Sequence, residues 1–215
     1  MKIEAIIFDL GGVIINIDYQ ATISKFKKLG IDNFQQLYSQ ANQVNLFDEY
    51  ETGVISSQRF INELLHFHPE GTTANEVVEA WNAMILDVRV EKLNLLEHLK
   101  KDYRLFLLSN TNALHLSKVQ RNWNCATESP MEHYFEKLYY SHEIGLRKPS
   151  IKIFEFVCKE NNLNPNCTLF IDDSVQHISG AIEYGLKTIH HSQNGPLDYL
   201  LSSHNSINTL SVDLG

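Results

Sequence analysis

Apolar residues follow two different patterns along the chain, which divide it into an early helical stretch and a later alternating one. A short run rich in β-branched residues, Ile3 to Phe8, predicts a buried strand at the start. From about Asp18 to Met84 the apolar positions keep helical spacing without an intervening strand, which indicates a bundle-like insert. The helices expected there cover 19–29, 34–46, a segment capped by Ser56 or Ser57, and a segment beginning at a Thr73–Glu76 capping box.

Helices and strands alternate from Val90 onward. The pattern predicts strands over 105–108, 137–140, 168–171 and 187–189, and helices over 90–100, 113–123, 150–161 and 177–184. Such alternation is typical of a parallel sheet with right-handed crossovers. The chain is therefore expected to have an α/β fold with helices packed on a parallel sheet.

Polar residues follow three of the predicted strands, and a lysine precedes a helix: Asp9, Ser109 with Asn110, Asp172 with Asp173, and Lys148. Open α/β sheets bind ligands in the crevice outside the carboxyl ends of their strands. Carboxylates gathered in one crevice raise one another's pKa unless a cation lies between them, and oxygen ligands with open positions suit Mg²⁺. A hydroxyl, backbone N–H groups at a helix start and an ammonium would complete a phosphate cradle.

Composition limits the kinds of molecule that the chain is expected to bind and the setting in which it is expected to function. The chain has 215 residues, a net charge of −8 and no basic block, which argues against binding nucleic acid or an anionic membrane. It contains no apolar run of the length that spans a membrane. Its three cysteines form no CxxC pair, so a reducing cytoplasm is the expected setting.

Four segments together resemble the motifs of the haloacid dehalogenase superfamily of hydrolases, in the order found in that family. They are Phe8-Asp9-Leu10-Gly11-Gly12-Val13, Leu108-Ser109-Asn110-Thr111-Asn112, Gly145-Leu146-Arg147-Lys148-Pro149 and Phe170-Ile171-Asp172-Asp173-Ser174. The first two are most similar to the branch that contains sugar-1-phosphate (α-D-glucose-1-phosphate) phosphatases. The resemblance implies a Rossmann-like core over 1–17 and 88–215, with a helical cap of the C1 type inserted over 18–87.

The resemblance also implies a role for each motif residue. Asp9 would be the nucleophile that attacks phosphorus and forms an aspartyl-phosphate. Ser109 and Lys148 would hold the transferring phosphoryl group, with Asn110 assisting. A Mg²⁺ ion would be held by Asp9, Asp173, the backbone carbonyl of Gly11 and, less directly, Asp172. The expected function is Mg²⁺-dependent hydrolysis of a small phosphorylated metabolite, with a sugar phosphate as the expected class.

Position 11 departs from the family pattern. Most phosphatases of the family have an aspartate there that protonates the leaving oxygen, whereas this chain has Gly11. General acid–base assistance is worth about 10²–10⁴-fold, and its loss affects poor leaving groups most. We therefore expect a preference for sugar-1-phosphates or activated phosphates over 6-phosphates. Asp18 is nine residues after Asp9 and could replace the acid, but a capping role for the first cap helix is expected.

Two alternatives remain open from the sequence. One is a metal-free 2-haloacid dehalogenase in which Asp9 attacks carbon, although paired acids at 172 and 173 favour a metal. The other is a low-turnover protein that binds or senses a phosphometabolite, because Gly11 removes the acid. The acidic residues Asp48 and Glu51 in the cap are interpreted as a solvated helix end rather than as substrate contacts.

Overall fold

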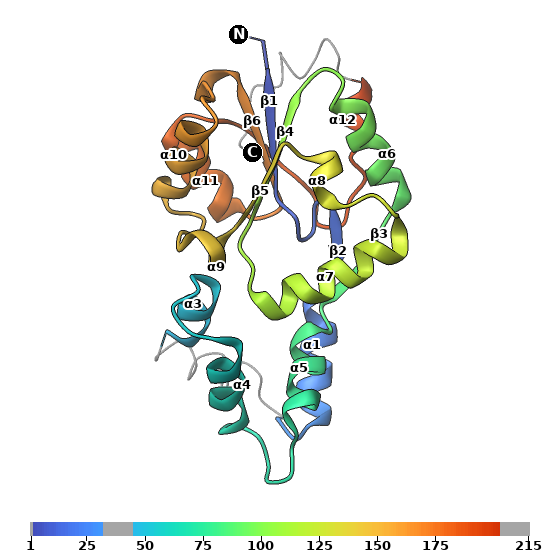
Figure 1. Ribbon diagram of the computed structural model, residues 1–215, viewed down its shortest axis with the longest axis vertical. Helices are drawn as coiled ribbons and strands as arrows, with labels where there is room; N and C mark the ends of the chain where they lie inside the picture. Colours follow the sequence, from blue (N-terminus) through green and yellow to red (C-terminus); the bar gives the residue numbers. More distant parts are fainter. Residues whose placement is uncertain (1, 32–44, 203–215) are drawn as a thin grey trace.

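A parallel sheet forms the centre of the computed structural model, which describes residues 2–31 and 45–202 (Figure 1). Its five strands lie in the order β5-β4-β1-β6-β7, and each neighbouring pair is parallel. The predicted α/β fold with a parallel sheet is thus confirmed. The strands are β1 (Ala5–Phe8), β4 (Arg104–Ser109), β5 (Lys137–Tyr140), β6 (Thr168–Asp172) and β7 (Lys187–His190).

Helices cover both faces of this sheet because its strands are apolar on both sides. One face packs against α6 (Val90–Leu99), α7 (Ala113–Ala126) and α8 (Met131–Tyr134), and the other against α10 (Ile151–Glu160) and α11 (Val175–Tyr184). Short elements complete this part of the chain: α9 (Ser141–Ile144), the 3-10 turn η1 (Pro165–Cys167) and α12 (Tyr199–Ser202). No helix within 2–31 and 45–202 has the length and apolar character needed to cross a membrane.

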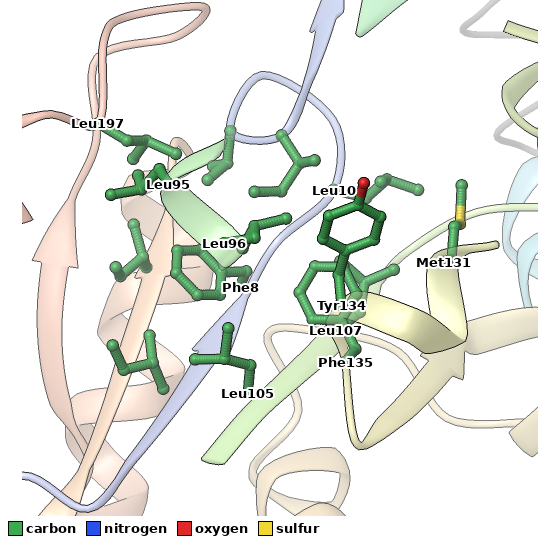
Figure 2. Packing of buried hydrophobic residues seen from close by; sticks show 14 of the residues in the cluster. Phe8, Leu10, Leu95, Leu96, Leu105, Leu107, Met131, Tyr134, Phe135 and Leu197 are labelled. Atoms are coloured by element: carbon green, nitrogen blue, oxygen red, sulfur yellow. The ribbon is translucent and has the colours of Figure 1, made fainter. Parts of the chain in front are cut away.

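The side chains of β1 alternate between these two layers. Phe8 packs toward the α6 side among Leu95, Leu96 and Leu105, as Figure 2 shows. Ile7 points to the opposite layer, where it joins the cluster formed with α10 and α11. Each such side chain, fully buried, stabilises the fold by roughly 1.5–3 kcal/mol. The central strand is therefore fixed from both sides, and so is the residue that follows it.

Two short strands lie outside this sheet and were not predicted. β2 (Ile15–Ile17) pairs antiparallel with β3 (Ile85–Val88), although about 70 residues separate them. Between them lie α1 (Tyr19–Lys28), α3 (Leu46–Glu51), α4 (Ser57–Leu65) and α5 (Ala74–Asn82), which gather at one end of the molecule in Figure 1. The predicted helix over 34–46 falls almost wholly outside the described residues.

Three of the helices between β2 and β3, namely α1, α4 and α5, begin where the sequence predicts, whereas α3 begins at Leu46, where a predicted helix was expected to end. The four helices share a core of their own. Asp18 accepts from the N–H of Gln20, so it caps α1, as expected. Ser56 caps α4, and Thr73 forms the predicted capping box at α5. Aromatic side chains fill the space between these helices, with Phe47 stacked on Trp81 at 5.5 Å and Tyr50 stacked on Phe60 at 4.1 Å between ring centroids.

Candidate active site

The register of the sheet brings the sequence-predicted residues to one edge. Phe8 pairs with Leu107 on one side and with Ile171 on the other. Asp9 therefore emerges between the ends of β4 and β6, where Ser109 and Asp172 are the last strand residues. The carboxyl ends of parallel strands meet at one edge, so residues 100 to 160 positions apart in sequence become neighbours.

Lys148 lies at the centre of this group. Its side chain is fully buried, and its ammonium donates to Asp9 Oδ1 at 2.6 Å, to Asp172 Oδ2 at 2.6 Å and to the carbonyl of Leu108 at 3.0 Å. An ammonium has three donors, and each has a partner here. Burial disfavours the charged amine, but the two carboxylates outweigh it and raise the pKa of Lys148. The group is therefore a buried cation that joins two acids.

The two acids joined by Lys148 have different protonation behaviour. Burial and the charge of Asp172 raise the pKa of Asp9 to about 7, against the opposing effect of Lys148. Burial acts in the same direction on Asp172, but Lys148 and His177 outweigh it and hold its pKa below the ordinary value. One ammonium thus keeps Asp172 ionised and leaves Asp9 to titrate near neutrality. A second cation at this site would hold Asp9 in the ionised form that a nucleophile needs.

Three carboxylates lie close enough to share a metal ion. Asp9, Asp172 and Asp173 each offer an oxygen, and these oxygens lie within 4.8 Å of one another. Both oxygens of Asp172 already face Lys148, the Ser174 N–H or His177. Two of the acids instead line a cavity together with Gly11, namely Asp9 and Asp173. Oxygen donors with excess negative charge fit Mg²⁺, so the residues present are suited to hold it.

Gly12 allows the acids to approach this closely. Its φ of 76° is left-handed, and a Cβ atom there would lie 2.3 Å from Asp173 Oδ2. Any other residue would therefore displace the Asp173 carboxylate. Gly11 differs, because a Cβ atom at that position would meet only the Ile17 side chain, at 3.6 Å. Position 11 thus has room for a Cβ atom, whereas position 12 does not.

The predicted phosphate-binding residues have two different environments. Ser109 is buried and lines the cavity beside Asp9. Asn110 also lines the cavity, but its side chain donates to the Lys148 carbonyl and accepts from the Lys148 N–H, both at 2.9 Å. This side chain therefore fixes the backbone of the loop over residues 145–150, the lysine loop. A cis peptide bond between Lys148 and Pro149 lies within it.

Two residues outside the predicted set of ligands also support the site. His177 Nδ1 lies 3.0 Å from both oxygens of Asp172. Ser141 accepts from the Thr111 N–H and donates to the Thr111 carbonyl, which ties β5 to the loop after β4. Ser141 follows the predicted strand 137–140 directly, so the rule that identified the other strand-end residues also applied to it.

Gly180 supports the site by having no side chain. It lies on α11 where that helix crosses the lysine loop, and a Cβ atom at position 180 would come within 2.1 Å of the Pro149 carbonyl oxygen. The helix can therefore pack directly on the backbone that follows Lys148. No local pattern around Gly180 predicts this contact, because it depends on Pro149 in a different element.

A cavity of about 470 Å³ opens from the acids toward α1, α3 and α5. Glu51, the last residue of α3, lines it together with Arg147, and their Oε2 and Nη2 atoms lie 2.9 Å apart. Burial raises the pKa of Glu51 to about 7, whereas the charge of Lys148 lowers it. The interpretation of Glu51 as part of a solvated helix end is wrong. The apolar wall of the cavity includes Leu10, Ile15, Ile17, Ile23, Phe47, Trp81, Met84, Ile85 and Val119.

Comparison with known proteins places this geometry among related hydrolases. The family model of the haloacid dehalogenase-like hydrolases matches residues 3–185. The D-ribitol-5-phosphate phosphatase of Bacteroides thetaiotaomicron is 34% identical over 86% of this chain and 90% of its own length. A haloacid dehalogenase family enzyme of the same organism, solved with magnesium and inorganic phosphate, matches with a TM-score of 0.81 and 33% identity over 92% of this chain and 98% of that one. A hydrolase structure from Porphyromonas gingivalis matches with a TM-score of 0.83 and 28% identity over 94% and 97%.

Proposed function

Because the chain belongs to the haloacid dehalogenase-like hydrolase family, we propose that it is a Mg²⁺-dependent phosphatase acting on a small sugar or polyol phosphate. One observation carries the proposal: the buried Lys148 ammonium joins Asp9 to Asp172 at the inner end of a cavity that Asp9 and Asp173 line. The proposal includes residues 18–87 as a cap that covers this cavity. The three free cysteines fit the cytoplasmic setting that we also propose.

Asp9 is proposed to attack the phosphorus atom of the bound ester. A bond forms between its carboxylate oxygen and phosphorus while the bond from phosphorus to the ester oxygen breaks, and the departing oxygen takes a proton from a water molecule because Gly11 supplies none. Lys148 orients the attacking carboxylate through the hydrogen bond to Oδ1, and Ser109 lies beside it to bind a phosphoryl oxygen. Asn110 keeps the lysine loop in place through its side chain, so its proposed contact with phosphate is made by the backbone.

Mg²⁺, held by Asp9, Asp173 and the Gly11 carbonyl, would offset the negative charge that the phosphate brings to these acids. Asp172 supports the site by holding Lys148 and His177 rather than by direct ligation. In the second half of the reaction, water attacks the aspartyl-phosphate, phosphate leaves and the Asp9 carboxylate is restored. Closure of the cavity excludes bulk water from the first step and so favours transfer to Asp9.

Gly11 is expected to affect which leaving groups react fastest. Without an acid at this position, esters that leave easily, such as sugar-1-phosphates, are expected to react faster than primary esters. The Bacteroides thetaiotaomicron relative is named for D-ribitol 5-phosphate, a primary ester. A panel containing glucose 1-phosphate, glucose 6-phosphate and ribitol 5-phosphate, with Mg²⁺ and with EDTA, tests both points. Faster turnover of the primary esters would refute the leaving-group expectation and leave the phosphatase assignment intact.

Two further measurements separate this proposal from its rivals. Release of halide from a 2-haloacid in EDTA, without phosphatase activity, would support a metal-free dehalogenase. A phosphatase should instead yield phosphate covalently attached to Asp9 when the reaction is quenched with acid and the protein is analysed by mass spectrometry. The Asp9→Asn variant provides the control, because an amide oxygen is too weak a nucleophile to form the intermediate. Absence of both label and turnover would favour a protein that only binds phosphometabolites.

A further inference from the structure

We propose that Glu51, held in place by Arg147, binds hydroxyl groups on the leaving part of the substrate and so selects polyhydroxylated esters without a second negative charge. The inference rests on the proposed phosphatase function and specifies the substrate class of the same site. Glu51 and Arg147 are charged residues of the cavity wall that have no part in the chemistry proposed for Asp9. They lie on α3 and on the lysine loop, so they meet across the cavity mouth.

The position of Glu51 is fixed by contacts on both sides of it. Tyr50 lies next to it in α3, and its hydroxyl contacts the N–H of Leu114 at 3.2 Å and the hydroxyl of Ser57 at 2.8 Å. Gly53, two residues beyond, approaches the backbone so closely that a Cβ atom would lie 2.1 Å from the His142 carbonyl oxygen. The end of α3 therefore rests directly on the sheet-bearing part of the chain, and the Glu51 carboxylate enters the cavity from a fixed backbone.

Arg147 supplies the matching donor. It precedes Lys148, whose backbone is fixed by Asn110, and its guanidinium forms ion pairs with both Glu51 and Asp48. A carboxylate accepts hydrogen bonds from hydroxyl groups, and a guanidinium donates to them, so the pair can serve a vicinal diol. The charge of Lys148 favours the ionised Glu51 carboxylate against the effect of burial.

The charges of Glu51, Asp48 and Arg147 predict which substrates the cavity excludes. Two carboxylates, Glu51 and Asp48, face one guanidinium, which leaves one negative charge in excess. A substrate with a second phosphate or a carboxylate would bring like charge toward Glu51, whereas hydroxyl groups would not. The cavity also has an apolar lining, with Phe47, Trp81 and other side chains that can pack against the carbon chain of a polyol. Such a mixture of apolar lining and a few polar groups is typical of sites for small ligands.

Steady-state kinetics at pH 8 with Mg²⁺ tests the inference. The probes are ribitol 5-phosphate, p-nitrophenyl phosphate, which has no hydroxyl chain, and 2-phosphoglycolate, which has a second anion. Glu51→Gln should lower the kcat/KM ratio of ribitol 5-phosphate to p-nitrophenyl phosphate by about 10- to 100-fold, mainly through KM, since a hydrogen bond to a charged group is lost. The same change should raise the ratio of 2-phosphoglycolate to p-nitrophenyl phosphate.

Asp48→Asn is the matched control. Asp48 shares the guanidinium but does not line the cavity, so its substitution should leave the ribitol ratio within about twofold, while Arg147→Lys, which loses the planar fork, should lower it. Equal effects of Glu51→Gln and Asp48→Asn, or no effect of Glu51→Gln, would overturn the inference. So would a loss confined to kcat that Gly11→Asp restores, because Glu51 would then be a proton donor. Failure of the unsubstituted enzyme on all three esters and on glucose 1-phosphate would refute the proposed function, whereas turnover without the Glu51→Gln effect would refute only this inference.

Discussion

Substitution of Lys148 by methionine tests whether one buried ammonium balances the acids of the site. Methionine has similar length and no charge, so the change removes the hydrogen bonds to Asp9 and Asp172 without creating a large cavity. Both acids are buried, with 6% and 0% of their surface exposed, so water cannot replace the lost cation. Removing one partner of a buried ion pair costs about 3–5 kcal/mol, and we expect the free energy of unfolding to fall by that amount near pH 8.

The loss should depend on pH in a defined direction. In the Lys148→Met protein the pKa values of Asp9 and Asp172 rise, because Lys148 no longer opposes burial and mutual repulsion. A carboxyl group with a raised folded-state pKa destabilises the fold progressively as pH rises above its unfolded-state pKa. The difference between the two proteins should therefore be larger at pH 8 than at pH 5, where the acids protonate and are no longer charged.

Urea denaturation in EDTA, at pH 5 and pH 8, measures this difference. Lys92→Met is the matched control, because Lys92 is also buried but donates to the carbonyl of Val13 at 2.5 Å. Its loss leaves a neutral acceptor unsatisfied, at a cost of about 1–3 kcal/mol. Burial lowers the pKa of Lys92 to about 8, so it is protonated over most of this range and the control should vary little with pH. A Lys148→Met loss below about 1 kcal/mol at pH 8, or one that grows toward pH 5, would refute the reasoning.

Two further predictions concern position 11 and a buried histidine. Position 11 has room for the Cβ atom of an aspartate. Gly11→Asp should therefore raise kcat/KM for ribitol 5-phosphate at least about tenfold more than for p-nitrophenyl phosphate. Equal changes for the two esters in steady-state assays would contradict a role for this residue in protonating the leaving group. Burial lowers the pKa of His115 to about 4, so unfolded chains bind more protons below pH 6.5 and stability falls as pH drops. Urea titrations should show that His115→Gln removes about 2 kcal/mol of the loss between pH 7 and pH 5, and an unchanged pH slope would contradict this.

Local patterns in the sequence were sufficient to predict the sheet and much of the site. Each strand of the sheet is a short apolar run, and helices separate the strands, so parallel order and a shared carboxyl edge follow from general rules. Asp9, Ser109 and Asp172 could be placed at that edge for this reason. The caps at Ser56 and Thr73 were predictable because capping depends on residues only three positions apart.

The features that were not predicted depend on partners far away in the chain. β2 has three residues and exists as a strand because β3 returns beside it about 70 residues later. Asn110 looked like a phosphate ligand, but its amide is used by the Lys148 backbone, 38 positions away. Glu51 looked solvated at a helix end until Arg147 and the surrounding cavity were visible. In each case local spacing identifies the residue type, and only tertiary contact decides what the residue touches.

Gly180 shows that a position can matter to this enzyme through the atoms it does not have. The helix around it contacts the Pro149 carbonyl with no gap for even one carbon atom. Because every other amino acid adds at least that atom, homologous chains that keep this contact are expected to retain glycine here as strictly as they retain the acids. A library of variants screened for altered substrate range should therefore leave Gly180 unchanged. A survey of sequence variation that considers only polar residues would miss this position, although few positions tolerate substitution less.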